Sequence, residues 1–348
     1  MAKIDDVARL ARVSKGTVSN VFSQKRPTSD EIRERVMRVS KQLNYVPNHT
    51  ARSLVTKKTM AIGLTIPYGS FFFTAFHMQF INGVILEAAY YGYRVLLDII
   101  PSQEVKTPFL TSYPIDGAVV MRPTANDERI NQMHLGQIPF VTVGHVMNEN
   151  IEHFTSVDND NHQIMYNICE YLISKGHKDI MFLNASELMT VSIDRKASFI
   201  HAMKDHGLDV EEHMIHHKPD LDSSEYMDYG YEETILILGK QKKKVTAIIA
   251  DDERTAFSVL KALKDLNLSV PGDVSLFVVC GDHSMMVQSN PALTSMDLQP
   301  SELGAQSVRL LMHQLGVLQG DFSGNIIVEG KIIERNSVST IDHKEKHN

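Results

Sequence analysis

The sequence contains no tryptophan and only two cysteines, and no part of it reaches the roughly 18 consecutive apolar residues of a membrane span. Cys169 and Cys280 are too few for a disulfide framework, and two reduced thiols are typical of a cytoplasmic protein. The segment MAKIDDVARL lacks the apolar region of an export signal. We therefore expect a cytoplasmic protein that does not associate with membranes.

Motifs that would indicate an enzyme are also missing. The chain has no GxSxG, P-loop or HExxH sequence. His213, His216 and His217 stand close together, but in a polar connection without the spacing of metal ligands. We expect a solvated loop at these histidines, and neither a metal site, a cofactor nor catalytic activity.

Charge is divided unequally along the chain. Residues 1–58 contain 13 Lys and Arg against 5 Asp and Glu, whereas the remaining 290 residues contain 22 against 37. A basic head on an acidic body indicates that polyanion binding is confined to the head. With 348 residues, of which 43% are hydrophobic, the chain is long enough for two or three packed domains.

The head is predicted to contain three short helices. Apolar residues recur at helical spacing over residues 4–11, and Ser14 is a suitable N-cap for a second helix over residues 15–22. Only two residues separate these helices, which is typical of a helix-turn-helix motif. Thr28 and Glu31 match a capping box for the third helix.

The second helix of such a motif enters the major groove of DNA, where its exposed N-terminal residues meet base edges. The residues so placed are Lys15, Gly16 and Asn20, with Ser14, Thr17 and Ser19 better placed for phosphates. The alternative interpretation is a three-helix surface domain without DNA binding. The net positive charge and the tight corner favour DNA.

The segment after the third helix has features of a conditional helix. Pro47 ends the third helix, and Asn48 can cap a further helix of about eight residues. A helix this short is marginal in water, so we expect it to form only when DNA and a second copy of the chain hold it. Leu54 is then a candidate wedge between base steps of the minor groove. A plain interdomain linker is the alternative.

These motifs together resemble the N-terminal signature of the lactose/galactose repressor (LacI/GalR) family. The matching segments are IDDVA (4–8), VS (13–14), TVS (17–19), LNYVPN (43–48) and ARSL (51–54). The resemblance implies a homodimeric transcription regulator that binds a near-palindromic operator in double-stranded DNA. By the same resemblance a hinge helix contacts DNA through Asn48, Ala51, Arg52 and Leu54, and Leu54 intercalates.

Three positions depart from the family pattern. Lys3 stands where a capping Thr is common, so the first helix is expected to fray at its start. Arg12 replaces a frequent turn glycine, which costs up to about 1 kcal/mol if the residue is left-handed. Asn20 stands where the family often has Arg, so the half-site sequence of relatives does not transfer to this chain.

From Met60 onward the pattern changes to apolar runs that alternate with amphipathic stretches. Strands are predicted at 60–66, 93–99, 117–121, 139–144, 179–184, 245–250 and 274–280, and helices at 76–91, 126–136, 161–175, 194–206, 224–239 and 253–267. Alternating strands and helices favour doubly wound parallel sheets in two α/β lobes. A last helix at 300–318 and a strand at 325–333 are expected to return across both lobes. This body resembles the periplasmic-binding-protein-like core of the same family.

The predicted domains follow from these patterns. Residues 1–46 form the all-α helix-turn-helix domain, 47–58 the hinge helix and linker, 59–340 the core, and 341–348 a disordered tail. Within the core, lobe one is expected over about 59–158 and 285–322, and lobe two over about 159–284 and 323–340.

Candidate effector residues lie at the predicted strand ends, where open α/β sheets bind ligands. Asp158 and Asp251 each follow a predicted strand, and Arg195 opens a predicted helix. Carboxylates and guanidinium groups suit the hydroxyl pairs of sugars. Taken singly, each residue is as well explained as a helix cap or a surface ion pair. The resemblance places all three at effector-contact positions, with Asp251 in place of a common Asn.

Three further residues complete the candidate effector site. The segment VCGDH (279–283) departs from the family pattern, and Asp282 falls near its ligand position. Phe72 and Phe73 follow the first strand and could stack on a sugar ring, although a buried aromatic cluster is an equal alternative.

The sequence thus predicts a DNA-binding transcription regulator, specifically a repressor of a sugar-catabolic operon, whose small polar effector binds between the lobes. A global carbon-catabolite regulator with a phosphoprotein corepressor is an alternative. A sugar-binding protein without DNA function is another, but it predicts an export signal and no basic head.

Overall fold

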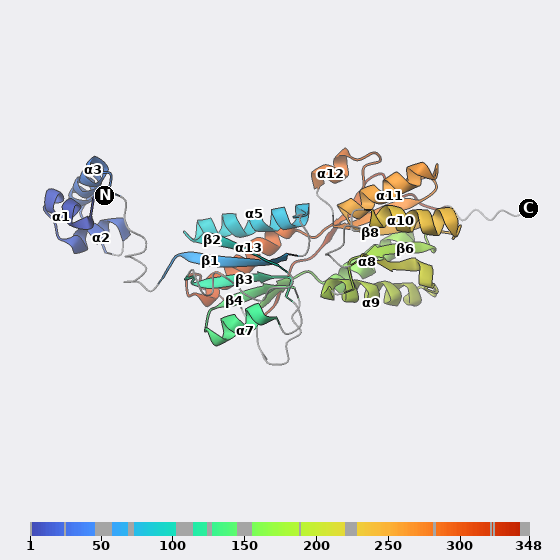
Figure 1. Cartoon of the computed structure of the whole chain (residues 1–348), viewed down its shortest axis with the longest axis horizontal. Coiled ribbons are helices and arrows are strands. Elements are labelled where there is room, and N and C mark those ends of the chain that lie inside the picture. The colour runs from blue at the N-terminus through green and yellow to red at the C-terminus, as the bar shows by residue number, and fades with distance from the viewer. Residues whose placement is uncertain are drawn as a thin grey trace, which may run out of the picture. The chain divides into compact units, whose positions relative to one another are not determined.

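A computed structural model describes residues 2–23, 26–45, 58–68, 73–101, 114–123, 127–144, 155–187, 189–219, 228–280, 283–320, 322 and 324–341. The chain divides into two compact units, Met1–Thr59 and Met60–Asn348, which are coloured by residue number in Figure 1. Among the described helices, none is long and apolar enough to cross a membrane.

The first unit contains the three predicted helices. They are α1 (Ile4–Ala11), α2 (Lys15–Ser23) and α3 (Asp30–Gln42). Its small core consists of the apolar positions that helical spacing indicated: Val7, Ala8, Ala11, Val18, Val21, Val36 and Val39 are buried. Because each helix contributes to this core, none of them depends on propensity alone.

The helix ends of this unit show how the sequence departures are accommodated. A lysine side chain carries no acceptor atom, but the backbone N–H of Lys3 donates to the Asp6 carboxylate at 3.0 Å. Arg12 is left-handed, with φ of 51°. The predicted capping box is wrong, because α3 starts at Asp30 with Ser29 at its N-cap. The Thr28 hydroxyl instead takes part in the turn before α3.

The second unit contains two six-stranded sheets. The first sheet has the order β11-β5-β4-β3-β1-β2 and the second β12-β10-β9-β8-β6-β7. The strands of the first are β1 (Ala61–Tyr68), β2 (Arg94–Pro101), β3 (Gly117–Met121), β4 (Phe140–Val143), β5 (Ser156–Asp158) and β11 (Ile326–Ile327). Those of the second are β6 (Ile180–Asn184), β7 (Ile215–His217), β8 (Ala247–Asp252), β9 (Ser275–Cys280), β10 (Thr294–Asp297) and β12 (Lys331–Ile333). All described pairings are parallel except β10 with β12.

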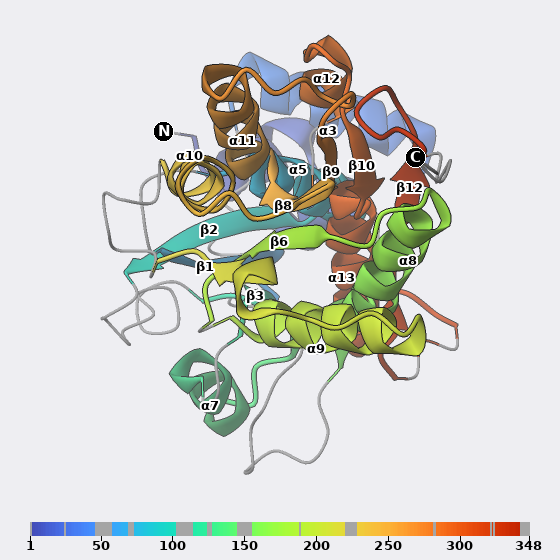
Figure 2. The ribbon, with the colours of Figure 1, turned by 90° about the vertical axis from the view of Figure 1, so that its right-hand side faces the viewer.

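Helices cover both faces of each sheet, as Figures 1 and 2 show. In lobe one, α5 (Ala75–Tyr90) and α13 (Pro300–Gln314) cover one face and α7 (Glu128–Leu135) the other. In lobe two, α8 (Asn161–Ser174) and α9 (Thr190–Asp205) lie opposite α10 (Tyr229–Thr234), α11 (Glu253–Asp265) and α12 (His283–Gln288). The predicted α/β class is confirmed, and α10 continues as a π-helix over Ile235–Lys240.

The division between the lobes differs from the predicted one near the C-terminus. We expected the chain to return to lobe one at about residue 285, but β10 pairs with β9, so lobe two extends to Asp297. The predicted single strand at 325–333 is two short strands, because β11 pairs with β5 in lobe one and β12 pairs with β10 in lobe two. Local periodicity does not report which sheet a short strand joins.

Three chain segments therefore connect the lobes, and one side chain joins them. Asn159 lies between β5 and α8, and its side-chain amide donates to the carbonyl of Leu298 at 3.1 Å and to that of Val328 at 2.7 Å. Leu298 lies between β10 and α13, and Val328 between β11 and β12. The buried Asn159 amide thus fixes the spacing of all three crossings.

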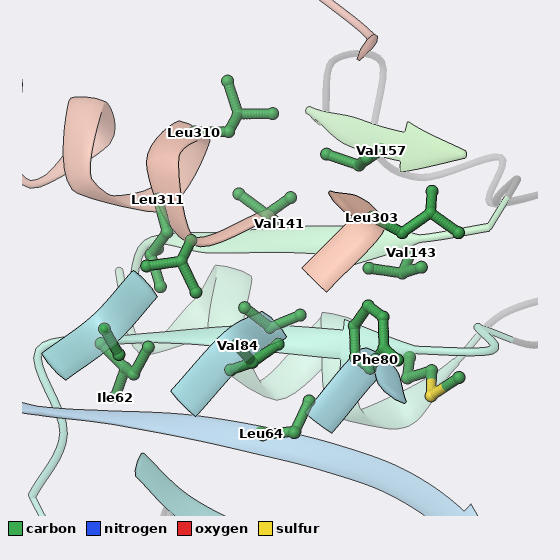
Figure 3. Packing of buried hydrophobic residues seen from close by; sticks show 14 of the residues in the cluster. Ile62, Leu64, Phe80, Val84, Val141, Val143, Val157, Leu303, Leu310 and Leu311 are labelled. Atoms are coloured by element: carbon green, nitrogen blue, oxygen red, sulfur yellow. The ribbon is translucent and has the colours of Figure 1, made fainter. Parts of the chain in front are cut away.

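The core of lobe one depends on a close approach of α5 and α13. Figure 3 shows Phe80 and Val84 of α5 and Leu303 and Leu311 of α13 packed beside the sheet residues of this cluster. A Cβ added at Gly83 would lie 2.0 Å from the carbonyl oxygen of Ser301, well inside any permitted contact. Glycine is therefore required there to bring the two backbones together.

Replacing Gly83 with Ala should destabilise the core by about 1 to 3 kcal/mol, because the added methyl group forces the two helices apart. The exposed neighbour Asn82 is the control, since Asn82→Ala adds helix propensity without a clash. Urea unfolding followed by circular dichroism measures both variants. Equal stabilities for G83A and the wild type would contradict this account of the helix pair.

Candidate DNA-binding and effector sites

The N-terminal end of α2 forms an exposed polar surface on the first unit. The Ser14 hydroxyl oxygen accepts the backbone N–H of Thr17 at 3.0 Å, which confirms its role as the cap of this helix. Ser14, Lys15, Gly16 and Ser19 are exposed, while Thr17 is half-buried. The predicted DNA-contact residues at this end of the helix therefore share one accessible surface.

Within the described residues, no strong contact requires Gly16 or Lys15 at its position. A Cβ on Gly16 would meet only the Ser14 hydroxyl, at an ordinary 3.6 Å, so no contact within the described residues requires glycine there. Lys15 forms an exposed ion pair with Asp5 of α1. Such exposed pairs contribute little to stability and are easily exchanged for another anion.

The side chain of Asn20 forms hydrogen bonds within the head, whereas we predicted that it contacts bases. Its amide nitrogen donates to the carbonyl of Arg26 and to the hydroxyl of Thr28, both at 2.9 Å. Its amide oxygen accepts the backbone N–H of Arg26 at 2.9 Å. These bonds tie the turn before α3 to α2, so a contact with a base would require Asn20 to give them up. Sequence could not show this use, because a polar residue on an exposed helix looks the same in either role.

Several predicted site residues lie outside the described residues. They are the hinge residues Asn48, Ala51, Arg52 and Leu54, and the effector candidates Phe72 and Asp282. The predicted disordered tail falls almost wholly outside them as well.

Lobe two brings Arg195 and Asp251 together at the carboxyl end of its sheet. Arg195 lies on α9, which starts at Thr190 rather than at the predicted residue 194. Its Nη1 donates to Oδ1 of Asp251 at 2.7 Å, and its Nε donates to the side chain of Asn161 at 3.2 Å. Both members of the ion pair are buried. Two residues that are 56 positions apart in the sequence thus form one polar group, as the strand-end rule indicated.

A second cation, Lys218, extends this group. Its ammonium nitrogen donates to Oδ2 of Asp251 at 3.2 Å and to Oδ2 of Asp252 at 2.7 Å. Asp252 also caps α11, since its Oδ1 accepts both the N–H and the hydroxyl of Thr255 at 2.9 Å. Burial alone raises the pKa of Asp252, but Lys218 and the Thr255 hydrogen bonds outweigh it, so the pKa is lowered.

The four charged side chains Arg195, Lys218, Asp251 and Asp252 define what we call the lobe-two ion network. It balances two cations against two carboxylates, which allows these charges to be buried. Each carboxylate oxygen has two lone pairs, so an oxygen that already accepts one hydrogen bond can accept another. The network therefore suits a neutral ligand that carries both donors and acceptors.

Asp158 lies in lobe one, at the start of a crossing segment. It ends β5 on a crossing segment, where its Oδ1 accepts the backbone N–H of Asn159 at 2.8 Å. The hydrogen bonds of Arg195 go to Asp251 and Asn161 instead. The prediction that Asp158 contacts the effector remains a prediction.

On the lobe-one side, Phe73 precedes α5 and its ring lies 6.0 Å from that of His77. The Nδ1 atom of His77 accepts the backbone N–H of Thr74 at 3.3 Å, and it lies 2.8 Å from the Thr74 hydroxyl. Because Nδ1 is an acceptor, the neutral ring carries its proton on Nε2. Burial first, and then the charges of Arg122 and Arg254, lower the pKa of His77 to about 4.

One hydrogen bond joins the two lobes beside these groups. Glu253 of lobe two is the first residue of α11, and its Oε1 accepts the N–H of Ala75, the first residue of α5 in lobe one, at 3.2 Å. Burial is the main cause that raises the pKa of Glu253. The carboxyl ends of β1 and β8 therefore face each other across the lobe boundary.

Sequence reasoning missed Lys218, Asp252, Glu253 and His77. Asp252 had a detectable signal, because an Asp three residues before Thr255 at a strand end is a typical helix cap. Lys218, Glu253 and His77 had none, since their partners come from other parts of the fold.

The predicted solvated loop around His213, His216 and His217 is wrong. His213 lies in a 3-10 helix and the other two in β7, where His216 approaches Glu233 at 2.8 Å. Over the part of the chain that the structure describes, no group of three or more His, Cys, Asp or Glu residues is arranged to hold a metal ion.

A helix-turn-helix unit joined to a two-lobed α/β core defines the class of ligand-responsive DNA-binding regulators. Residues 3–48 match the model for bacterial regulatory proteins of the lacI family, and residues 169–338 match a periplasmic binding protein-like domain. The chain belongs to the LacI family of transcriptional regulators. This membership supports the prediction that it is not an enzyme.

Known relatives are similar over nearly the whole chain. The transcriptional regulator RegA of Clostridium saccharobutylicum is 29% identical, over 96% of this chain and 98% of that protein. The Lac repressor dimer bound to operator and the anti-inducer ONPF has the same fold, with a TM-score of 0.81, 20% identity and coverage of 97% and 99%. The regulator CelR in complex with cellobiose has a TM-score of 0.70, 22% identity and coverage of 97% and 100%.

The His77 ring predicts an acid-dependent loss of stability. Its pKa of about 4 in the folded chain lies below the unfolded value of 6.5, so the unfolded chain binds a proton that the native chain does not. The part of the unfolding free energy that depends on a neutral His77 ring is fully present above pH 6.5, and it is lost as the pH falls from there through about 4. The full loss is on the order of 3 kcal/mol.

The control for this prediction is His77→Asn, which keeps an acceptor near the Nδ1 position but does not titrate. Unfolding free energies of both proteins are measured in urea from pH 4 to pH 8. The wild type should lose stability relative to H77N on acidification, and parallel curves would show that the ring is not held neutral.

Proposed function

We propose that this regulator represses a sugar-catabolic operon from the cytoplasm, and that a neutral sugar or sugar derivative bound between the lobes controls its affinity for the operator. The observation that carries the proposal is the lobe-two ion network, which places a buried, charge-balanced polar surface at the carboxyl ends of the strands. An open α/β sheet binds its ligands at that edge. The regulator CelR, which has the same fold and forms a complex with cellobiose, supports this class of effector.

DNA binding is assigned to the exposed start of α2 together with the hinge residues. Ser14, Thr17 and Ser19 are proposed to contact phosphates, and Lys15 and Gly16 base edges. Gly16 fits this role, because a residue without a side chain allows the backbone to approach the groove closely. The excess of basic residues in the head predicts binding that weakens steeply with salt.

A homodimer is proposed to present two heads to the operator. One face of α5 exposes Met78, Ile85, Leu86 and Tyr90, with 56%, 47%, 63% and 80% of each residue accessible. The edge strand β2 adds Leu97 and Ile99. A large exposed apolar surface of this kind indicates an interface, and the Lac repressor structure of the same fold is a dimer on its operator. We call these six residues the apolar stripe.

The mechanism links ligand to DNA through the lobes. A sugar that binds one relative orientation of the lobes more tightly than another shifts the population toward it. In a dimer that shift changes the spacing of the two segments that precede Met60, and thus the stability of hinge helices that are marginal on their own. Inducer and corepressor differ only in which orientation they favour.

Replacing Leu54 with Ala should weaken operator binding by about tenfold to a hundredfold and reduce DNA bending, because the wedge that opens the central base step is lost. The operator is a duplex enriched from a random pool by the wild-type protein. Affinity is measured by fluorescence anisotropy at several salt concentrations, and bending by gel mobility.

Lys57→Ala is the matched control for a phosphate contact. It should reduce the salt dependence by about one unit of log–log slope for every duplex, whereas L54A should leave that slope unchanged. Wild-type affinity and bending in L54A would remove the hinge from the mechanism.

Arg195→Lys should weaken sugar binding by about tenfold or more, because lysine keeps the charge beside Asp251 but loses the fork that donates in two directions. Calorimetric titration of the wild type with glucose, maltose and cellobiose first identifies a ligand, and the variant is then titrated with it. Undiminished binding by a folded R195K protein would place the effector elsewhere.

A further inference from the structure

Glu253 has one carboxylate oxygen bound and one buried without a partner. Its Oε1 accepts the Ala75 N–H at 3.2 Å. Its Oε2 is buried and has no hydrogen-bond partner among the residues that the structure describes. Only 4% of the residue is exposed. A buried carboxylate oxygen without a hydrogen bond is costly, so the position requires a donor.

The surroundings of Glu253 indicate that a bound ligand supplies this donor. The residue directly follows Asp252, a member of the lobe-two ion network, so it lies at the margin of the proposed effector site. Across the lobe boundary stands the positive N-terminal end of α5, a helix of 16 residues. A ligand in contact with the ion network therefore lies within reach of both lobes at this point.

We propose that Glu253 is an effector-contact residue that joins a neutral, hydroxyl-bearing ligand to the first turn of α5. A ligand hydroxyl donates to Oε2 while Ala75 continues to donate to Oε1. This assignment rests on the proposed function, since it names the ligand class and a contact of the same site. A phosphorylated sugar is disfavoured at this contact, because Glu253 adds a negative charge beside a network whose own charges are balanced.

The same contact gives the ligand a direct path to lobe one. Ala75 is the first residue of the helix that carries most of the apolar stripe, and that helix packs closely on α13 through Gly83. A ligand that holds Glu253 in place also holds the start of α5. Its effect on DNA binding should therefore depend on the Ala75 N–H, even where its affinity does not.

Two substitutions separate the ligand contact from the link to α5. Glu253→Gln has a single acceptor oxygen, so if that oxygen stays with Ala75 the amide nitrogen turns a donor toward the ligand. Ala75→Pro removes the N–H alone, because proline is well tolerated at the first position of a helix. Thr74, which precedes it, has ψ of 169°, as a residue before proline requires. The controls are Glu232→Gln, an exposed carboxylate of α10 in lobe two, and Ala75→Ser, which keeps the N–H.

Full-length proteins are titrated by calorimetry with glucose, maltose, cellobiose and glucose 6-phosphate, and circular dichroism verifies that each variant is folded. The wild type should bind a neutral sugar in preference to glucose 6-phosphate. E253Q should bind that sugar at least about tenfold more weakly, while E232Q binds it normally. A75P should bind it within about threefold of the wild type, yet lose most of the sugar-dependent change in affinity for the enriched duplex, and A75S should retain that change.

Each contrary result has a distinct meaning. Normal sugar binding by folded E253Q overturns the assignment of Glu253. An unaltered DNA response in A75P overturns the link to α5. A wild-type protein that selects its duplex but binds none of the neutral sugars, or prefers glucose 6-phosphate, overturns the ligand class and leaves the DNA-binding function intact. A wild-type protein that selects no duplex instead contradicts the proposed function itself.

Discussion

The three crossings between the lobes are the constraint on which the rest of the core depends. Because the chain passes between the lobes three times, each sheet takes a short edge strand from the last part of the sequence: β11 joins the first sheet after the second crossing, and β12 joins the second sheet after the third. Asn159 holds the three crossings at fixed spacing with one amide group. Relative motion of the lobes is therefore restricted to rotations that bend all three segments together, which is the kind of motion that hinge residues absorb.

That constraint also explains why charged groups gather at the lobe boundary. The carboxyl ends of parallel strands in both sheets meet there, and each strand end is followed by a helix start that favours an acidic cap. Asp252 and Glu253 are such residues, and the adjacent buried carboxylates of Asp251 and Asp252 need cations nearby. Lys218, which follows β7, and Arg195 of α9 supply them, so the network is satisfied without a ligand and still has acceptor capacity for one.

Much of the fold was predictable from the sequence, because periodicity reports which face of an element is buried. Strand β3 and helices α1 and α11 begin where the pattern placed them, and the meeting of Arg195 with Asp251 follows from the rule on strand ends. The lobe assignment of β10 was not predictable, since a four-residue strand has no periodicity to read and its partner is chosen by the folded core. Glu253 was not identified from the sequence for a related reason, because its partner Ala75 is 178 residues away.

Helix α5 is where these separate features converge. Its first turn meets the other lobe through Glu253, its inner face is fixed against α13, and its outer face carries the larger part of the apolar stripe. The backbone of α13 approaches Gly83 too closely for either helix to slide past the other, so the pair responds to a displacement as one body. A displacement of the first turn of α5 then moves the whole helix. A small contact at the lobe boundary can in this way displace the much larger apolar stripe. A hinge helix of marginal stability needs only such a displacement to form or to unfold.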